Sequence, residues 1–325
     1  MKRPEYNEIN FSIHKMILRM MYDYLSCGKY YLKHIIPNRK LLKKTASLRD
    51  SCKGKSAFVF GNGPSIRLLD PEKIRELRDK SGFSVFALNC FLQTDFGRKV
   101  RPTHFVLSDP LGFVTGTMRE NHFQRLIRDH GYSREYVESI EKEIHVTCRQ
   151  LINEKTPLFI PITFRSFLRT EILESDSVYF YPVYQTFFSN NVRNILRPLG
   201  INNATTYRML CIAHYLGYEK IYLCGLENDY RLCRLDRNNR ISFFWEHFFD
   251  TGRWITLAEN TKHLEETYSI FTGTLNLTKF PPGLITNLNP DSLIGVFSKI
   301  HDLDIYAKEH TYRIPDLNAI LTEGK

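Results

Sequence analysis

A glycine-containing turn after an apolar run is the first feature of this 325-residue chain that could bind an anion. The apolar residues 57–60 are followed by Gly61, Asn62, Gly63, Pro64 and Ser65. We expect a strand that ends at Gly61 and a helix capped by Ser65, an arrangement whose backbone N–H groups and helix dipole favour phosphate. The same residues are also common in an ordinary turn, and the third glycine of the dinucleotide fingerprint is missing.

Polar side chains also follow the next two predicted strands. Residues 84–88 end at Asn89, and residues 102–107 end at Ser108 and Asp109. Because ligands bind at the carboxyl ends of strands in an open parallel sheet, we expect Asn62, Asn89 and Asp109 to share one cleft.

The second half of the chain repeats this pattern. Thr205 and Thr206 open an apolar helix that Gly217 ends, and a strand over residues 220–225 follows it. A helix, a glycine and a strand in succession indicate a parallel sheet, so we add the last residue of this strand and two residues that follow it to the candidate site. They are Gly225, Glu227 and Asp229.

These elements predict an α/β, Rossmann-like fold with a mostly parallel sheet and helices on both faces. We expect an N-terminal arm over residues 1–54, one domain over 55–300 with a lid-like insertion at about 228–260, and a tail over 301–325. Within the domain, we expect charged helices over 113–142, a strand over 144–148 and a short helix over 164–174.

The arm carries nearly all of the net charge of +10, because residues 1–55 hold 13 Lys or Arg and 4 Asp or Glu. Apolar residues at helical spacing between 11 and 25 predict an amphipathic helix that binds an anionic membrane surface. Packing of this helix on the body is the alternative, and nucleic acid is disfavoured because the body is nearly neutral. The apolar run is too short to span a bilayer, and no signal-peptide pattern is present.

Seven cysteines without a CxxC pair indicate free thiols in a reducing compartment. We therefore expect a cytoplasmic protein that is peripheral on the inner membrane; a homo-oligomer is compatible with the sequence. No spacing fits zinc, and Asp302 and Asp304 lie in a polar tail, so we expect no metal and no cofactor.

His247 is the candidate general base. It lies among aromatic residues 243–249, with carboxylates at Glu246 and Asp250. Burial lowers an imidazole pKa and a nearby carboxylate raises it, a balance that suits proton transfer near neutral pH. The alternative is that the aromatic segment fills a core and His247 is structural.

Several of these motifs resemble a known family when they are taken in order. They are residues 60–65, 86–89, 107–110, 216–225 and 287–293. They resemble the bacterial sialyltransferases of lipooligosaccharide synthesis, and equally a wider group of glycosyltransferases that build cell-surface polysaccharides. The resemblance implies a metal-independent enzyme that transfers a sugar from a CMP-sugar to a glycan or glycolipid. Sialic acid is the favoured sugar, and Kdo or another sugar carried on CMP stays open.

The resemblance also implies roles for individual residues. Asn62, Gly63, Ser65 and Asn89 would line the CMP site, with Asp109 where these enzymes have an asparagine. Thr205 and Thr206 would meet the donor, Tyr230 would bind the leaving phosphate, and His247 would deprotonate the acceptor. The chain departs from the family in having Asn202 and Asn203 where an arginine stands, and in lacking an identifiable second tyrosine.

Two other functions fit parts of the sequence. A Mg-dependent pyrophosphokinase of the pterin type could use Asp109, Glu227 and Asp229 around a triphosphate. A non-catalytic, membrane-associated protein that binds a glycan or nucleotide fits if His247 belongs to the core.

Overall fold

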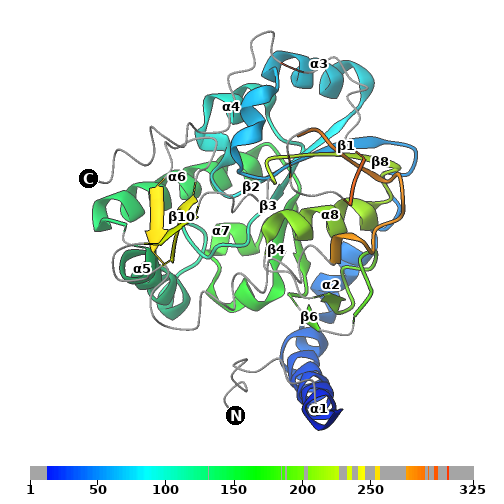
Figure 1. The fold of residues 1–325 in the computed structure, drawn as a ribbon, viewed down its shortest axis with the longest axis vertical. Helices are drawn as coiled ribbons and strands as arrows, with labels where there is room; N and C mark the ends of the chain where they lie inside the picture. Colours follow the sequence, from blue (N-terminus) through cyan, green and yellow to red (C-terminus); the bar gives the residue numbers. More distant parts are fainter. Residues whose placement is uncertain are drawn as a thin grey trace.

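The computed structural model describes residues 13–130, 132–183, 185–186, 189–200, 204–226, 233–235, 241–245, 253–256, 276–289, 292, 296–298 and 306. Its centre is a seven-stranded sheet in the order β12-β8-β1-β2-β3-β4-β5, and every pair in it is parallel (Figure 1). The strands are β1 Ser56–Phe60, β2 Ser84–Leu88, β3 His104–Val106, β4 Leu158–Pro161, β5 Val178–Tyr181, β8 Lys220–Cys224 and β12 Ile285–Asn287. The expectation of an α/β protein with a mostly parallel sheet is confirmed.

Helices cover both faces of this sheet. The helices α3 Pro71–Ser81, α4 Asp95–Val100, α5 Gly116–His130, α6 Arg134–Asn153 and α7 Thr170–Leu173 contribute to one buried cluster. α8, Thr205–Leu216, belongs to a second cluster on the other face. β1 shows the alternation that separates them, since Phe58 and Phe60 belong to the first cluster and Ala57 and Val59 to the second.

Because helices cover both faces, the strands are apolar throughout, and this explains why the sequence predicts them well. Residues 57–60 of β1 are completely buried. The following helix α3 has the expected caps: the Asp70 carboxylate accepts a hydrogen bond from Glu72 N at 2.9 Å, and Gly82 closes the helix with φ +66°.

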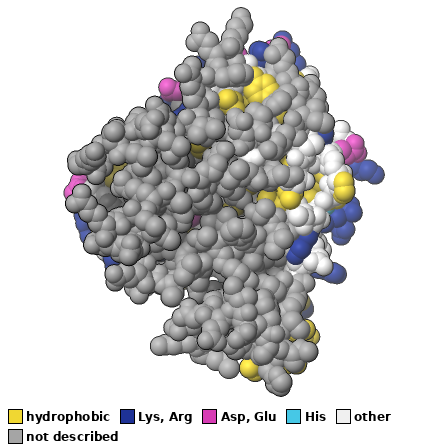
Figure 2. All heavy atoms as spheres, in the orientation of Figure 1, with side chains coloured by type: hydrophobic (Ala, Val, Ile, Leu, Met, Phe, Trp, Pro, Cys, Tyr) yellow, Lys and Arg dark blue, Asp and Glu magenta, His cyan; other side chains and the backbone are white. Residues whose placement is uncertain are grey.

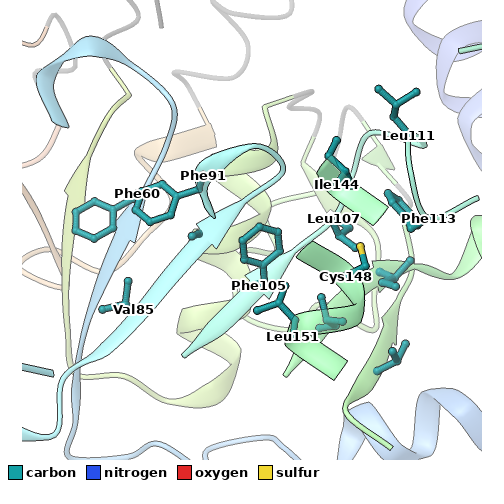
Figure 3. Packing of buried hydrophobic residues seen from close by; sticks show 14 of the residues in the cluster. Phe60, Val85, Phe91, Phe105, Leu107, Leu111, Phe113, Ile144, Cys148 and Leu151 are labelled. Atoms are coloured by element: carbon teal, nitrogen blue, oxygen red, sulfur yellow. The ribbon is translucent and has the colours of Figure 1, made fainter. Parts of the chain in front are cut away.

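The predicted strand over residues 144–148 is wrong, because these residues lie inside α6. Ile144, Cys148 and Leu151 are buried at helical spacing and pack under β3, close to Phe105 and Leu107 (Figure 3). The short helix expected over 164–174 is divided into a 3-10 turn, Ile162–Phe167, and α7.

The N-terminal region is helical, as expected. α1 Ile13–Tyr30 continues through a π-turn, Tyr31–Ile35, and a 3-10 turn, Ile36–Asn38, into α2 Arg39–Ala46. Figure 1 shows α1 projecting from the body, whereas α2 lies against β5, where Thr45 Oγ1 donates to Phe180 O at 2.7 Å. Within the described residues, no helix combines the length and apolar character needed to cross a membrane.

Three short strands lie in the predicted lid-like insertion. β9 Cys233–Leu235, β10 Ile241–Trp245 and β11 Arg253–Thr256 form an antiparallel sheet in the order β11-β10-β9. A further pair, β6 Gln185–Thr186 and β7 Leu199–Gly200, is parallel. From the predicted tail, Tyr306 donates to Leu288 O at 2.9 Å, and the rest of the tail lies outside the described residues.

His104 provides a test of this packing through pH. Its ring stacks on Phe86 with the centroids 4.4 Å apart, and burial lowers the pKa of His104 to about 4. Below about pH 6.5, His104 is protonated in the unfolded chain but stays neutral in the folded chain. The free energy of unfolding therefore falls as the pH falls from 6.5 to 4. Between about pH 7 and pH 5, we expect the free energy of unfolding of His104→Phe to fall by about 2 kcal/mol less than that of the wild type, as measured by urea denaturation. Equal losses in the two proteins would show that the ring is protonated in the folded state.

Candidate functional site

The turns after β1 and β8 meet where the strand order reverses. Gly61 N donates to Cys224 O at 2.8 Å, and Gly63 N donates to Gly225 O at 2.9 Å. A Cβ placed on Gly61 would lie 2.0 Å from Gly225 O, so glycine is required for the two backbones to approach this closely. Two N–H groups of the predicted anion site are thus already bonded to the turn after β8.

Ser65 lies beneath this corner and does not cap a helix. It is completely buried, its Oγ accepts a hydrogen bond from Gly225 N at 3.0 Å, and Cys224 Sγ is 3.3 Å away. The expected N-cap is wrong, since the residues form a 3-10 turn, Pro64–Leu68, with Gly63 before it and no side-chain cap. Ser65 and the buried Pro64 therefore hold the corner together, and Asn62 is the half-buried residue left to meet a ligand.

Asn62 has an unsatisfied acceptor. Its Oδ1 is buried and has no hydrogen-bond partner among the described residues. A buried polar atom without a partner costs free energy, which a ligand that donates a hydrogen bond would recover.

Asn89, Ser108, Asp109 and Thr205 form one polar network at the same edge of the sheet. Asn89 Nδ2 donates to Asp109 Oδ2, and Asn89 Oδ1 accepts from Ser108 N at 3.4 Å. The Ser108 hydroxyl bonds to the Thr205 hydroxyl, which joins the ends of β2 and β3 to the start of α8. Asn89 has φ +42°, a conformation that asparagine tolerates better than most residues. Of the three residues expected to share one cleft, Asn89 and Asp109 are in direct contact, and the place of Asn62 in the same cleft stays a prediction.

The start of α8 lies against the glycine corner as well. Thr206 is buried, with its Oγ1 3.1 Å from the position of a Cβ on Gly61. Ala204 precedes the helix, and its side chain supplies no hydrogen bond to the N–H groups of the first turn. The helix dipole makes this position favourable for negative charge.

Arg208, in the first turn of α8, is a functional candidate that the sequence analysis missed. Burial raises the pKa of Tyr181, at the end of β5, to about 12, and the nearby Arg208 guanidinium opposes this rise. The charge of Arg208 also acts on Tyr30 at the end of α1. A cation in the first turn of a helix is unfavourable because it opposes the helix dipole. An arginine at this position of a mostly apolar helix is the feature of the sequence that indicates a functional role.

A cavity of about 510 Å³ opens on the α4 side of the same corner. It is lined by Ile66, Arg67, Cys90, Gln93, Thr94, Asp95, Phe96 and Arg98. Burial raises the pKa of Cys90 to about 12, and the Asp109 carboxylate adds to the effect, so the thiol stays protonated at neutral pH and is a poor nucleophile. The cavity has the size of a small-molecule site rather than of a bound water.

The other predicted residues are not placed. Glu227, Asp229, Tyr230 and His247 lie outside the described residues, whereas Gly225 belongs to the corner. In the part of the chain that the structure describes, no three His, Cys, Asp or Glu side chains gather closely enough to hold a metal ion.

Replacing Gly61 with alanine tests the close approach of the two turns. Because the new Cβ would overlap backbone atoms of Gly225, we expect Gly61→Ala to lower the free energy of unfolding by about 3 kcal/mol in urea denaturation. Gly28→Ala is the control, since nothing lies within 4 Å of its Cβ and it stands inside α1. Equal stability of both variants would contradict the contact.

Ser65→Ala tests whether this serine is structural. The change leaves Gly225 N buried without its acceptor, so we expect the free energy of unfolding to fall by about 1–3 kcal/mol. The exposed Ser26→Ala should change it by less than about 0.5 kcal/mol. If Ser65→Ala is as stable as the wild type, the hydroxyl has no structural role and is again a candidate for binding a ligand.

Comparison with known proteins identifies no relative. No protein family matches the chain. No curated protein and no solved structure matches it either.

Proposed function

We propose that the protein is a glycosyltransferase with a Rossmann-like fold that moves a sugar, with sialic acid favoured, from a CMP-sugar to a cell-surface glycan. The observation that supports this best is the convergence of the ends of β1, β2 and β3 with the start of α8, where the strand order reverses. This position is the one at which open α/β sheets bind nucleotides.

The chemistry of the converging groups suits a nucleoside monophosphate ester. The first turn of α8 offers the positive end of the helix dipole to a single phosphate, and Arg208, whose charge acts on Tyr181, adds a cation in the same turn. Asn62 and the Asn89–Asp109 pair offer amide and carboxylate groups that can bond a base or ribose. A glycosyl phosphodiester held this way needs no metal ion to neutralise it, as the resemblance to CMP-sugar enzymes implies.

The transfer step rests on residues outside the described part of the chain. His247 takes the proton from the acceptor hydroxyl, whose oxygen attacks the anomeric carbon as the bond to the CMP oxygen breaks. Tyr230 donates a hydrogen bond to the departing phosphate, and the anomeric configuration is inverted.

Thermal-shift and calorimetric titration with CMP, CDP, UDP, GDP and ATP tests the proposal. We expect CMP to raise the melting temperature more than the other nucleotides, with or without EDTA, because a ligand stabilises the state that it binds. In the Thr205→Val protein we expect the affinity for CMP to fall about tenfold, since the hydroxyl is lost while the shape of the side chain is kept.

Thr278→Val is the control, because Thr278 is an exposed threonine outside the converging groups. It should bind CMP as the wild type does. Strict preference for ATP with Mg²⁺ would contradict the proposal and indicate a pyrophosphokinase; a chain that binds none of the five nucleotides would also contradict it.

A further inference from the structure

Helix α1 and the turns that follow it expose a continuous apolar stripe. Nine of the twelve exposed large hydrophobic side chains among the described residues lie between positions 17 and 36. They are Ile17, Leu18, Met20, Met21, Tyr24, Leu25, Tyr31, Leu32 and Ile36, and Leu25 is 66% exposed. Figure 2 shows apolar side chains on the surface at the end of the molecule where Figure 1 places α1.

The stripe occupies one side of the helix. Leu18, Leu25 and Leu32 recur every seven residues, with Met21 and Tyr24 between them. The half-buried residues Asp23, Cys27, Tyr30 and His34 recur at helical spacing on the opposite side. The helix therefore exposes its apolar side more than its polar side, the reverse of an amphipathic helix that packs on a core.

Cations surround this stripe. The segment 13–46 contains eight Lys or Arg and one acidic residue, Asp23. Lys29 and Lys33 within the exposed segment, and Lys40 and Lys43 in α2, are exposed. An apolar stripe with tyrosines, flanked by lysines, is complementary to a lipid surface that carries negative charge.

A second copy of the chain fits this surface less well. Apolar side chains cover an arc of the helix that is wider than the seam of a two-stranded coiled coil, and Gly28 leaves a gap in it. Pairing two such helices would also bring their lysines together with only Asp23 to balance them.

We propose that α1 lies in the surface of an anionic membrane with its apolar stripe among the acyl chains. The helix is fixed to the body at its carboxyl end, where the Tyr30 hydroxyl accepts a hydrogen bond from Val183 N at 2.9 Å. Val183 follows β5 at the carboxyl edge of the sheet, which is the edge that carries the polar network. Binding therefore brings this edge close to the lipid. If the protein is the proposed glycosyltransferase, its acceptor glycan is lipid-linked.

Co-sedimentation of the full chain with vesicles tests this proposal. We expect binding to vesicles that contain phosphatidylglycerol and much weaker binding to phosphatidylcholine alone. Leu25→Asp should weaken binding by about tenfold or more, since it places a charge within the stripe. Lys29→Gln combined with Lys33→Gln should reduce the preference for anionic vesicles by about tenfold.

Val146→Asp is the matched control, because Val146 on α6 is 58% exposed but stands outside the stripe. It should bind vesicles as the wild type does, and circular dichroism should show that all variants are folded. Equal binding by the wild type and Leu25→Asp, or equal binding to neutral and anionic vesicles, would overturn the proposal.

A dimer in sedimentation velocity that Leu25→Asp dissociates, without vesicle binding by the wild type, would also overturn it and assign the stripe to a second copy. Titration of Leu25→Asp with CMP separates the two proposals, because nucleotide affinity does not depend on this residue. Loss of vesicle binding alone therefore leaves the proposed reaction intact.

Discussion

The close contact between the turns after β1 and β8 is the constraint on which the rest of the structure depends. Gly61 and Gly225 approach so closely that neither turn has room for a side chain, and Ser65 and Cys224 fill the space below them. Two backbone N–H groups are used to hold the strands together, and so the corner cannot also act as an open anion nest. In the proposed function, ligand binding therefore falls to the neighbouring elements.

The neighbouring elements each contribute polar groups to the same edge of the sheet. The end of β2 supplies Asn89, the end of β3 supplies Ser108 and Asp109, and α8 supplies Thr205 and the positive end of its dipole. Each group alone is ordinary turn chemistry. Their hydrogen bonds to one another fix a polar surface, and in the proposed function this preorganisation reduces the entropy lost when the ligand binds.

The sequence predicted the elements whose patterns are local. Residues 84–88 and 220–224 are apolar runs closed by small polar residues, and both are strands with nearly the predicted ends. Residues 144–148 were misassigned because five residues are too few to separate a strand from a buried turn of helix; the spacing of Val137, Ile144 and Leu151 was needed.

The site was predictable in outline but not in its details. That Asn89 and Asp109 meet follows from strand ends in a parallel sheet, whereas the inward orientation of Ser65 depends on a partner 160 residues away. The place of Arg208 beside Tyr181 depends in the same way on which strand α8 crosses. Contacts between distant segments are set by the packing of the whole sheet, and a motif does not encode them.

The position of α8 has a consequence for the order in which the chain is made. The first five strands of the sheet and the helices between them come before residue 182, and those helices all belong to one of the two buried clusters. The opposite side, with Val59, Phe86, Leu88 and Val106, is covered mainly by segments that follow residue 182, including Val192, Ile195 and α8. When only the residues before 182 have left the ribosome, the nascent chain therefore exposes one apolar face of the sheet. We expect this intermediate to need a chaperone, or rapid completion of the chain, to escape aggregation.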